Sequence, residues 1–152
     1  TKGVHFMNPT DYLMNIQLTT KLHESLLKKI CVKYNLSLIE GKILCFLHNN
    51  PTKDTAADIV ELRMLSKGNV SSAIDKLCKQ GYIQRVPDKN NRRKIHLSLL
   101  SKADDINKDV DLMLIDYKQK IFDGFTMEEM HAYENLCQRI YFNVKKSMDN
   151  NN

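Results

Sequence analysis

The residues of this sequence best suited to bind another molecule form one basic block. Between Arg63 and Lys102 the chain carries ten lysines and arginines but only two acidic residues. The whole chain of 152 residues has a net charge of +5, so the rest of it is mildly acidic. A basic block on an acidic body is typical of a protein that binds a polyanion, although a run of charges can equally be a solvated face.

Two groups of polar side chains inside this block could contact duplex DNA. The first group opens an amphipathic helical pattern, and its small polar and basic side chains suit base edges and phosphates. It consists of Ser66, Lys67, Gly68, Asn69, Ser71, Ser72 and Lys76. The second group lies in a polar turn, from which basic side chains could neutralise phosphates or enter a narrow minor groove. It consists of Lys89, Asn91, Arg92, Arg93 and Lys94.

The elements that must position these groups are mostly helices. Apolar residues at helical spacing predict a first helix that follows the N-cap Asn8 and runs to about Lys33. A serine or threonine followed three residues later by an acidic residue marks further helix starts. These pairs are Ser37 with Glu40, Thr55 with Asp58, Ser101 with Asp104 and Thr126 with Glu129, and Ser66 caps one more helix.

The pattern changes to a period of two after Gly81. Residues 82–86 and 94–99 alternate between apolar and polar types, and the polar stretch 87–93 separates them. This pattern predicts a β-hairpin with a basic tip. The fold class is therefore mainly α with a small β-hairpin (α+β). The order of helix, short helix, tight turn, helix and hairpin predicts a winged helix-turn-helix.

Several segments resemble the MarR (multiple antibiotic resistance regulator) family of winged-helix regulators. They are Ala-Asp-Ile-Val-Glu-Leu at 57–62, Leu-Ser-Lys-Gly-Asn-Val-Ser at 65–71, Asp-Lys-Leu at 75–77 and Gly-Tyr-Ile-Gln-Arg at 81–85. The wing signature of the family, Asp-x-Arg and then Leu-Thr, falls on residues 91–93 and 99–100. Here Asn91 replaces the acid that would brace the wing arginine, and Leu100 replaces the threonine, which leaves Ser101 as the expected cap. Ser72 stands where many members carry an arginine.

This resemblance implies a sequence-specific regulator that binds double-stranded DNA at a pseudo-palindromic site as a homodimer, and a repressor that a small-molecule effector releases. It implies one domain over residues 9–148, with a DNA-binding module at 55–99 and dimerisation helices at 9–34 and 101–148. Two apolar stripes suit the dimer contact: Val110, Met113, Tyr117 and Ile121, and Cys137, Ile140 and Val144. A small aromatic or phenolic effector is expected between the dimer helices and the module, with Tyr12, His23 and Tyr34 as candidate contacts.

Other functions find less support in the sequence. The alternative is a winged-helix module that binds protein or RNA without reading a DNA sequence. An enzyme is not expected, because no nucleophile motif, phosphate-cradling loop or partnered carboxylate pair is present. Neither a cofactor nor a metal is expected, because the five histidines form no chelating pair.

The cysteines and the hydropathy suggest a location. The four cysteines are far apart in the sequence and lie in apolar helical patterns, which is typical of reduced core cysteines in the cytoplasm. Cys78, next to Lys79, could instead act as an oxidant-sensitive switch. No apolar run reaches the length that a membrane span needs.

Overall fold

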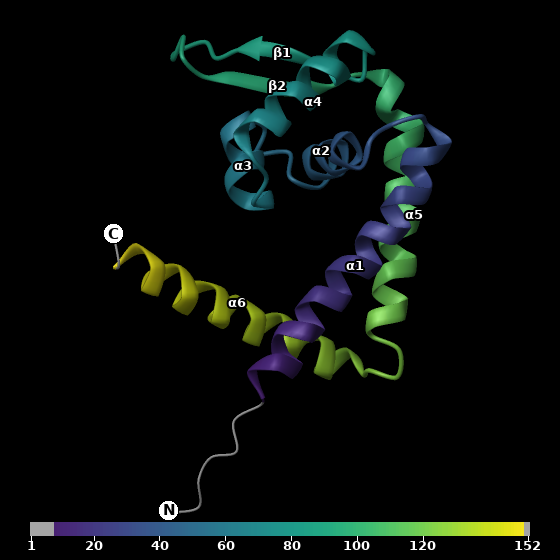
Figure 1. Cartoon of the computed structure of the whole chain (residues 1–152), viewed down its shortest axis with the longest axis vertical. Helices are drawn as coiled ribbons and strands as arrows, with labels where there is room; N and C mark the ends of the chain where they lie inside the picture. The colour runs from purple at the N-terminus through teal and green to yellow at the C-terminus, as the bar shows by residue number, and fades with distance from the viewer. Residues whose placement is uncertain (1–7, 151–152) are drawn as a thin grey trace, which may run out of the picture. The chain divides into compact units, whose positions relative to one another are not determined.

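The computed structural model of the chain describes residues 8–150, which divide into two compact units between Tyr117 and Lys118. The elements follow in the order shown in Figure 1. They are α1 (Pro9–Lys33), α2 (Leu38–Asn49), α3 (Ala56–Arg63), α4 (Lys67–Lys79), β1 (Ile83–Pro87), β2 (Ile95–Leu99), the 3₁₀ turn η1 (Ser101–Ala103), α5 (Asp104–Ile121) and α6 (Met127–Asp149). The predicted fold class, mainly helical with a two-stranded antiparallel hairpin, is confirmed.

Most of the helix starts lie where the local sequence predicts them. The side chain of Asn8 accepts a hydrogen bond from the Thr10 amide at 2.9 Å and begins α1. Capping boxes begin α2, α3 and α6, because in each a Ser or Thr hydroxyl accepts from the third residue of the helix and the carboxylate of that residue accepts from the cap amide. These bonds satisfy amides that the helix itself leaves unpaired.

The predicted start at Ser101 is wrong in detail. The Ala103 amide donates to the Leu100 carbonyl at 2.9 Å, so the chain leaves β2 through the 3₁₀ turn η1 and α5 begins only at Asp104. No side-chain hydrogen bond caps this turn. The turn η1 is therefore held by backbone hydrogen bonds, whereas the sequence pattern had predicted a cap by the Ser101 side chain.

The first unit has one apolar core built around α2. Ile43 and Leu44 of this helix are fully buried, and they share the core with buried residues of α1, α3, α4, the hairpin and α5. Each fully buried aliphatic side chain of this kind contributes about 1.5–3 kcal/mol. Gly41 allows α1 to approach α2 closely, because a Cβ atom at this position would clash with Sγ of Cys31. The helices α3 and α4 and the hairpin are therefore packed on one core.

The inner face of α5 packs within the chain itself. Val110 is 0% exposed and Met113 is 7% exposed, and both belong to the core of the first unit. The prediction that these two residues contact a second copy is therefore wrong, because their surface is already covered. Tyr117 is also engaged: its hydroxyl donates to the Thr19 carbonyl at 3.4 Å, and its ring meets His23 edge-on at 5.2 Å. Helix α5 thus runs beside α1 (Figure 1).

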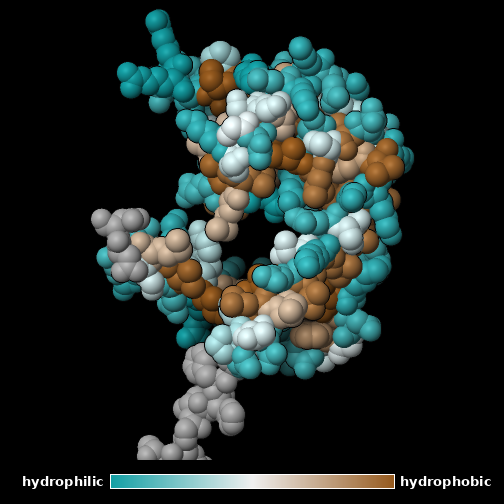
Figure 2. Space-filling model, in the orientation of Figure 1, coloured by the Kyte–Doolittle hydropathy of each residue, from teal (hydrophilic) through white to brown (hydrophobic). Residues whose placement is uncertain are grey.

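The second unit contains the end of α5 and helix α6. Phe122 packs edge-on against Phe125 and Tyr133, with ring centroids 5.6 Å and 5.4 Å away. No residue of α6 is buried, and large apolar side chains along it are exposed. Cys137, Ile140 and Val144 are among its exposed residues. Figure 2 shows the resulting hydrophobic surface along this helix.

Candidate nucleic-acid interface

A tight turn between α3 and α4 sets the direction of the second helix. Met64 closes α3 in the left-handed conformation, with φ of +52°. Two residues later the Ser66 hydroxyl accepts a hydrogen bond from the Asn69 amide at 3.3 Å and caps α4. A non-glycine residue seldom adopts a positive φ, so this compact turn is a specific local feature. The two helices and the turn form the helix-turn-helix.

Helix α4 divides its residues between the core and the solvent. Val70, Ala73, Ile74 and Leu77 are buried, and they hold the helix against α2 and α3. All seven residues predicted for DNA contact on this helix are exposed: Ser66, Lys67, Gly68, Asn69, Ser71, Ser72 and Lys76. The amide end of the helix carries a partial positive charge, which favours phosphate. This exposed helix end can present polar groups to a nucleic acid.

The hairpin forms the wing beside this helix. Strands β1 and β2 pair antiparallel, with Ile83 opposite Leu99 and Pro87 opposite Ile95. The five residues predicted for the wing, Lys89, Asn91, Arg92, Arg93 and Lys94, are all exposed. Figure 2 shows the loop end of the hairpin as a hydrophilic projection. The turn is held locally, because the Asn91 side chain accepts from the Arg93 amide at 3.1 Å.

Three residues that the sequence pattern did not bring together, Asp54, His96 and Asp88, connect the wing to the rest of the protein; we call them the brace. His96 lies between two carboxylates: Nδ1 is 2.7 Å from Oδ1 of Asp54, and Nε2 is 2.9 Å from Oδ2 of Asp88. The other oxygen of Asp88 accepts from the amides of Asn90 and Asn91, both at 2.8 Å. Asp88 therefore holds the loop through its backbone amides and through His96. The position of Asp88 in a polar turn is a local signal, but its contact with His96, which in turn contacts Asp54, is not.

The bonds of this brace change the pKa values of its members. Hydrogen bonds from His96 and from two amides lower the pKa of Asp88 to about 2. The hydrogen bond to Asp88 and, after it, the bond to Asp54 raise the pKa of His96 above its ordinary value. The charged forms of the His96 imidazole and the Asp88 carboxylate therefore favour each other.

Both acids of the basic block are engaged by cationic or imidazole partners. Asp75 on α4 lies 2.5 Å from the Arg85 guanidinium on β1, and Asp88 lies beside His96. Among the residues that the structure describes, no salt bridge engages the lysines and arginines of the two predicted groups, which are Lys67, Lys76, Lys89, Arg92, Arg93 and Lys94. The face that carries α4 and the wing is therefore positively charged.

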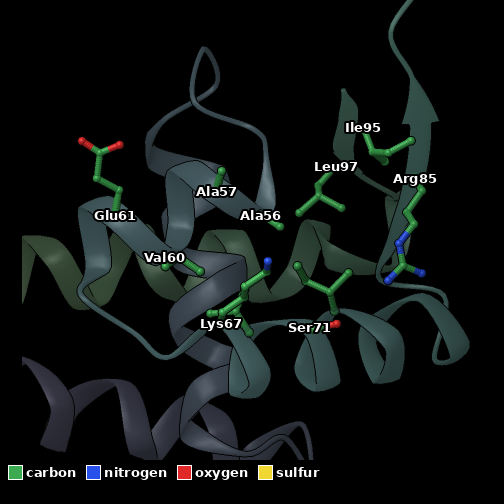
Figure 3. A pocket seen from close by; sticks show the side chains of 11 residues that line it. Ala56, Ala57, Val60, Glu61, Lys67, Ser71, Arg85, Ile95 and Leu97 are labelled. Carbon is green, nitrogen blue, oxygen red and sulfur yellow. The ribbon is translucent and has the colours of Figure 1, made fainter. Parts of the chain in front are cut away.

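An apolar groove of about 480 Å³ lies between α3, α4 and the hairpin. Figure 3 shows Lys67 pointing into this groove and Arg85 reaching from β1 toward α4. The walls are mostly aliphatic, and Glu61 and Ser71 also line the groove. The aliphatic lining residues are Ala56, Ala57, Val60, Val70, Ile74, Ile95 and Leu97. An apolar groove with two cations suits a small organic anion.

The residues predicted to contact an effector lie elsewhere, on or next to α1. The Tyr34 hydroxyl donates to Asp109 of α5 at 2.8 Å, and His23 packs against Tyr117. Burial and, after it, the charge of Arg63 lower the pKa of His23. Tyr12 is half-buried. None of the three lines the groove between α3, α4 and the hairpin.

The cysteines differ in their surroundings. Cys31 and Cys45 are buried, and burial raises the pKa of each thiol. Cys78 is half-buried and Cys137 is exposed, so the interpretation of Cys137 as a core cysteine is wrong for this chain by itself. Over residues 8–150 no group of three or more histidine, cysteine and acidic side chains could hold a metal ion. The helices of the same range include none that could span a membrane.

A helix-turn-helix with an exposed polar recognition helix and a basic hairpin next to it defines a winged helix-turn-helix protein. Residues 34–94 match the MarR family. The chain is 27% identical over 127 residues to the HTH-type transcriptional regulator PecS of Dickeya dadantii (strain 3937), across 82% of this chain and 74% of that protein. Over residues 34–94 the chain is therefore similar to the MarR family, and over a longer stretch it is similar to a transcriptional regulator.

Solved structures share the fold. A putative MarR family transcriptional regulator from Listeria monocytogenes, complexed with a 26mer DNA, superposes with a TM-score of 0.77 at 18% identity over 89% of each chain. The MarR protein from Peptoclostridium difficile gives a TM-score of 0.75 at 21% identity over 96% of this chain and 97% of that one. A mutant of MarR from E. coli, complexed with operator DNA, gives 0.63 at 16% identity over 88% and 99%. The predicted winged helix-turn-helix fold is thus confirmed, and so is the predicted resemblance to the MarR family.

Proposed function

We propose that this protein represses transcription by binding a pseudo-palindromic DNA site as a homodimer, and that a small effector releases it. The observation that carries the proposal is that both acids of the basic block pair with Arg85 and His96, while within residues 8–150 no salt bridge engages the lysines and arginines of the two predicted groups, which leaves those cations available for phosphates. A protein of this class acts on DNA, so we keep a cytoplasmic location as part of the proposal.

In this proposal the first turns of α4 enter the major groove. Asn69 and Ser71 are exposed there and carry groups that can donate to or accept from base edges. Lys67 and Lys76 would bind the backbone phosphates on either side. The wing would follow the DNA backbone, with Arg92 or Arg93 at the adjacent minor groove. Two DNA-bound relatives of similar fold support this arrangement.

The dimer is proposed from the apolar surface that the chain leaves exposed. Helix α6 has no buried residue, and Leu136, Ile140, Phe142 and Val144 on it are each 44–64% exposed. Soluble monomers rarely expose a large apolar surface, so we expect a second copy of the chain to cover the apolar side chains of α6. Within the predicted dimer set, Tyr117, Ile121, Cys137, Ile140 and Val144 remain in this proposal, because each keeps exposed surface. Residues 9–34 and 101–148 remain the proposed dimerisation helices of one domain over 9–148, with the module at 55–99.

The two-fold symmetry of such a dimer sets the form of the operator. Two recognition helices related by this axis would read half-sites about one helical turn apart. The expected operator is therefore a pseudo-palindrome.

The groove between α3, α4 and the hairpin is the proposed effector site. Its aliphatic walls suit an aromatic ring, and Lys67 and Arg85 suit a carboxylate or phenolate. A ligand there would engage Lys67 and lie against Ser71, two residues that the DNA complex also needs. Binding of the effector and binding of DNA would then compete. We prefer this groove to Tyr12, His23 and Tyr34, because His23 and Tyr34 already contact α5.

Selection from a random pool of duplex DNA tests the main proposal. The full chain should enrich a pseudo-palindromic site, and sedimentation should show two chains on each duplex. A hydroxybenzoate added to the complex should release the DNA. No enrichment, or equal competition by single-stranded RNA, would contradict sequence-specific DNA binding and favour an RNA-binding or protein-binding module instead.

A further inference from the structure

The loop of the wing is attached to the rest of the protein through His96. This loop carries Arg92 and Arg93 at its exposed end, between the last residue of β1 and the first of β2. A loop joined only by two short strands could pivot, and its arginines would lose conformational entropy on binding DNA. Contacts that fix the loop before binding reduce this cost.

The side chains around His96 form such a connection. Asp54 lies in the segment between α2 and α3, where its backbone carbonyl accepts from the Leu97 amide at 2.7 Å while its carboxylate contacts Nδ1 of His96. Asp88 contacts Nε2 of the same ring, and through its other oxygen it binds the amides of Asn90 and Asn91. The imidazole thus joins the base of the helix-turn-helix to the tip of the wing.

We propose that Asp54, His96 and Asp88 are positioning residues for the wing, and that the wing is held for DNA only while His96 is protonated. This inference rests on the proposed role of the wing in DNA binding. The reason lies in the donors of the ring. A cationic imidazole has two N–H groups and can donate to both carboxylates, whereas a neutral one has a single N–H and leaves one carboxylate facing a lone pair.

The charged groups around His96 favour the cation. Asp88 and Asp54 face the ring from the wing and from the α2–α3 segment, and Lys94 opposes them from the loop. The residue opposite His96 on β1 is the uncharged Val86. The net effect raises the pKa of His96, so the charged connection is complete below the ordinary pKa of histidine and is lost as pH rises through the raised value.

DNA affinity as a function of pH tests this inference. The full chain and its variants are titrated onto a fluorescein-labelled duplex recovered from the random pool, at low ionic strength, from about pH 6 to about pH 9. The wild-type affinity should fall roughly threefold to tenfold over this range, which corresponds to about one charge-assisted hydrogen bond. His96→Gln should bind with the weaker affinity throughout and show a flatter pH profile. Asp88→Asn, which keeps the oxygen that accepts from the loop amides, should show the same flattening.

His48→Gln is the matched control. His48 also pairs with a carboxylate, because its Nε2 lies 2.7 Å from Oδ1 of Asp111. This pair joins α2 to α5 and lies outside the proposed DNA interface. This variant should follow the wild type at every pH. If His96→Gln keeps the wild-type pH profile, the inference is overturned.

Amide hydrogen exchange separates this inference from the proposed function. Residues 89–94 of the free protein should exchange faster in His96→Gln than in the wild type, and faster in the wild type at high pH after correction for the intrinsic rate. Equal protection in the two proteins would overturn the inference even if DNA binds. Failure of the wild type to bind any duplex would instead contradict the proposed function, and the exchange data would still decide whether His96 holds the loop.

Discussion

The Asp75 carboxylate on α4 binds the Arg85 guanidinium on β1, so an ion pair joins the recognition helix to the wing. Asp75 and Arg85 are both substantially exposed, so this pair adds little stability. Its consequence is electrostatic, because it neutralises an acid that would otherwise face the DNA beside Lys76. Removal of the Asp75 charge separates the electrostatic effect of the pair from its effect on stability.

Replacement of Asp75 by asparagine should strengthen binding to duplex DNA at low salt, because it removes a negative charge next to the proposed interface. The free energy of unfolding should change by less than about 1 kcal/mol, as is usual for an exposed ion pair. Fluorescence anisotropy and urea denaturation measure the two quantities. Weaker binding would show instead that Asp75 is needed to position Arg85.

The variant Arg93→Ala should weaken DNA binding without unfolding the protein, because Arg93 is exposed and outside the core. If Arg93 neutralises one phosphate, the slope of log affinity against log salt should decrease by about 1. Titrations at several salt concentrations measure this slope. Lys28→Ala, on the exposed surface of α1, is the control and should leave it unchanged. An unchanged slope in Arg93→Ala would remove this arginine from the phosphate contacts.

The variant Asn69→Ala tests direct reading of a base. Asn69 is exposed in the first turn of α4, where a carboxamide could pair with one base edge. Loss of that contact should change the preference at a single operator position by about 1–3 kcal/mol. Repeating the duplex selection with this variant measures the change. Recovery of the same site with the same stringency would assign Asn69 no base contact.

The variant Ile140→Lys should convert the proposed dimer to a monomer and reduce affinity for the palindromic site. Ile140 is 44% exposed on α6, and a charge buried in an apolar interface is costly. Leu62→Lys is a matched control, because Leu62 on α3 is also 44% exposed. Sedimentation should show one chain for the first variant and two for the second. A dimer in both would exclude Ile140 from the contact.

The variant Met113→Ala tests the assignment of α5 to the core of one chain. Met113 is 7% exposed, and truncation of a buried methionine costs about 2–5 kcal/mol. Urea denaturation should show this loss at a protein concentration high enough to keep the dimer assembled. A loss that depends strongly on protein concentration would instead indicate that Met113 contributes to association.

The hairpin and all the helix starts except the one at Ser101 followed directly from the sequence. A capping box joins residues three apart, as in Thr55 with Asp58, so its geometry depends little on the rest of the fold. The alternation that predicted the hairpin is local for the same reason, and the polar first turn of α4 is a pattern of neighbouring residues. These signals were sufficient for the winged helix-turn-helix and for the exposed residues of the two groups predicted to contact DNA.

Tertiary packing alone decided which apolar stripe lies inside and which acids are paired. Val110 and Met113 have the same helical spacing as an interface stripe, and only the approach of α5 to the core shows that they are covered. Asp54 and His96 are 42 residues apart, and nothing in the pattern around either residue indicates the other. Local propensity acts over one or two turns of chain, whereas such contacts exist only once the core has brought distant segments together.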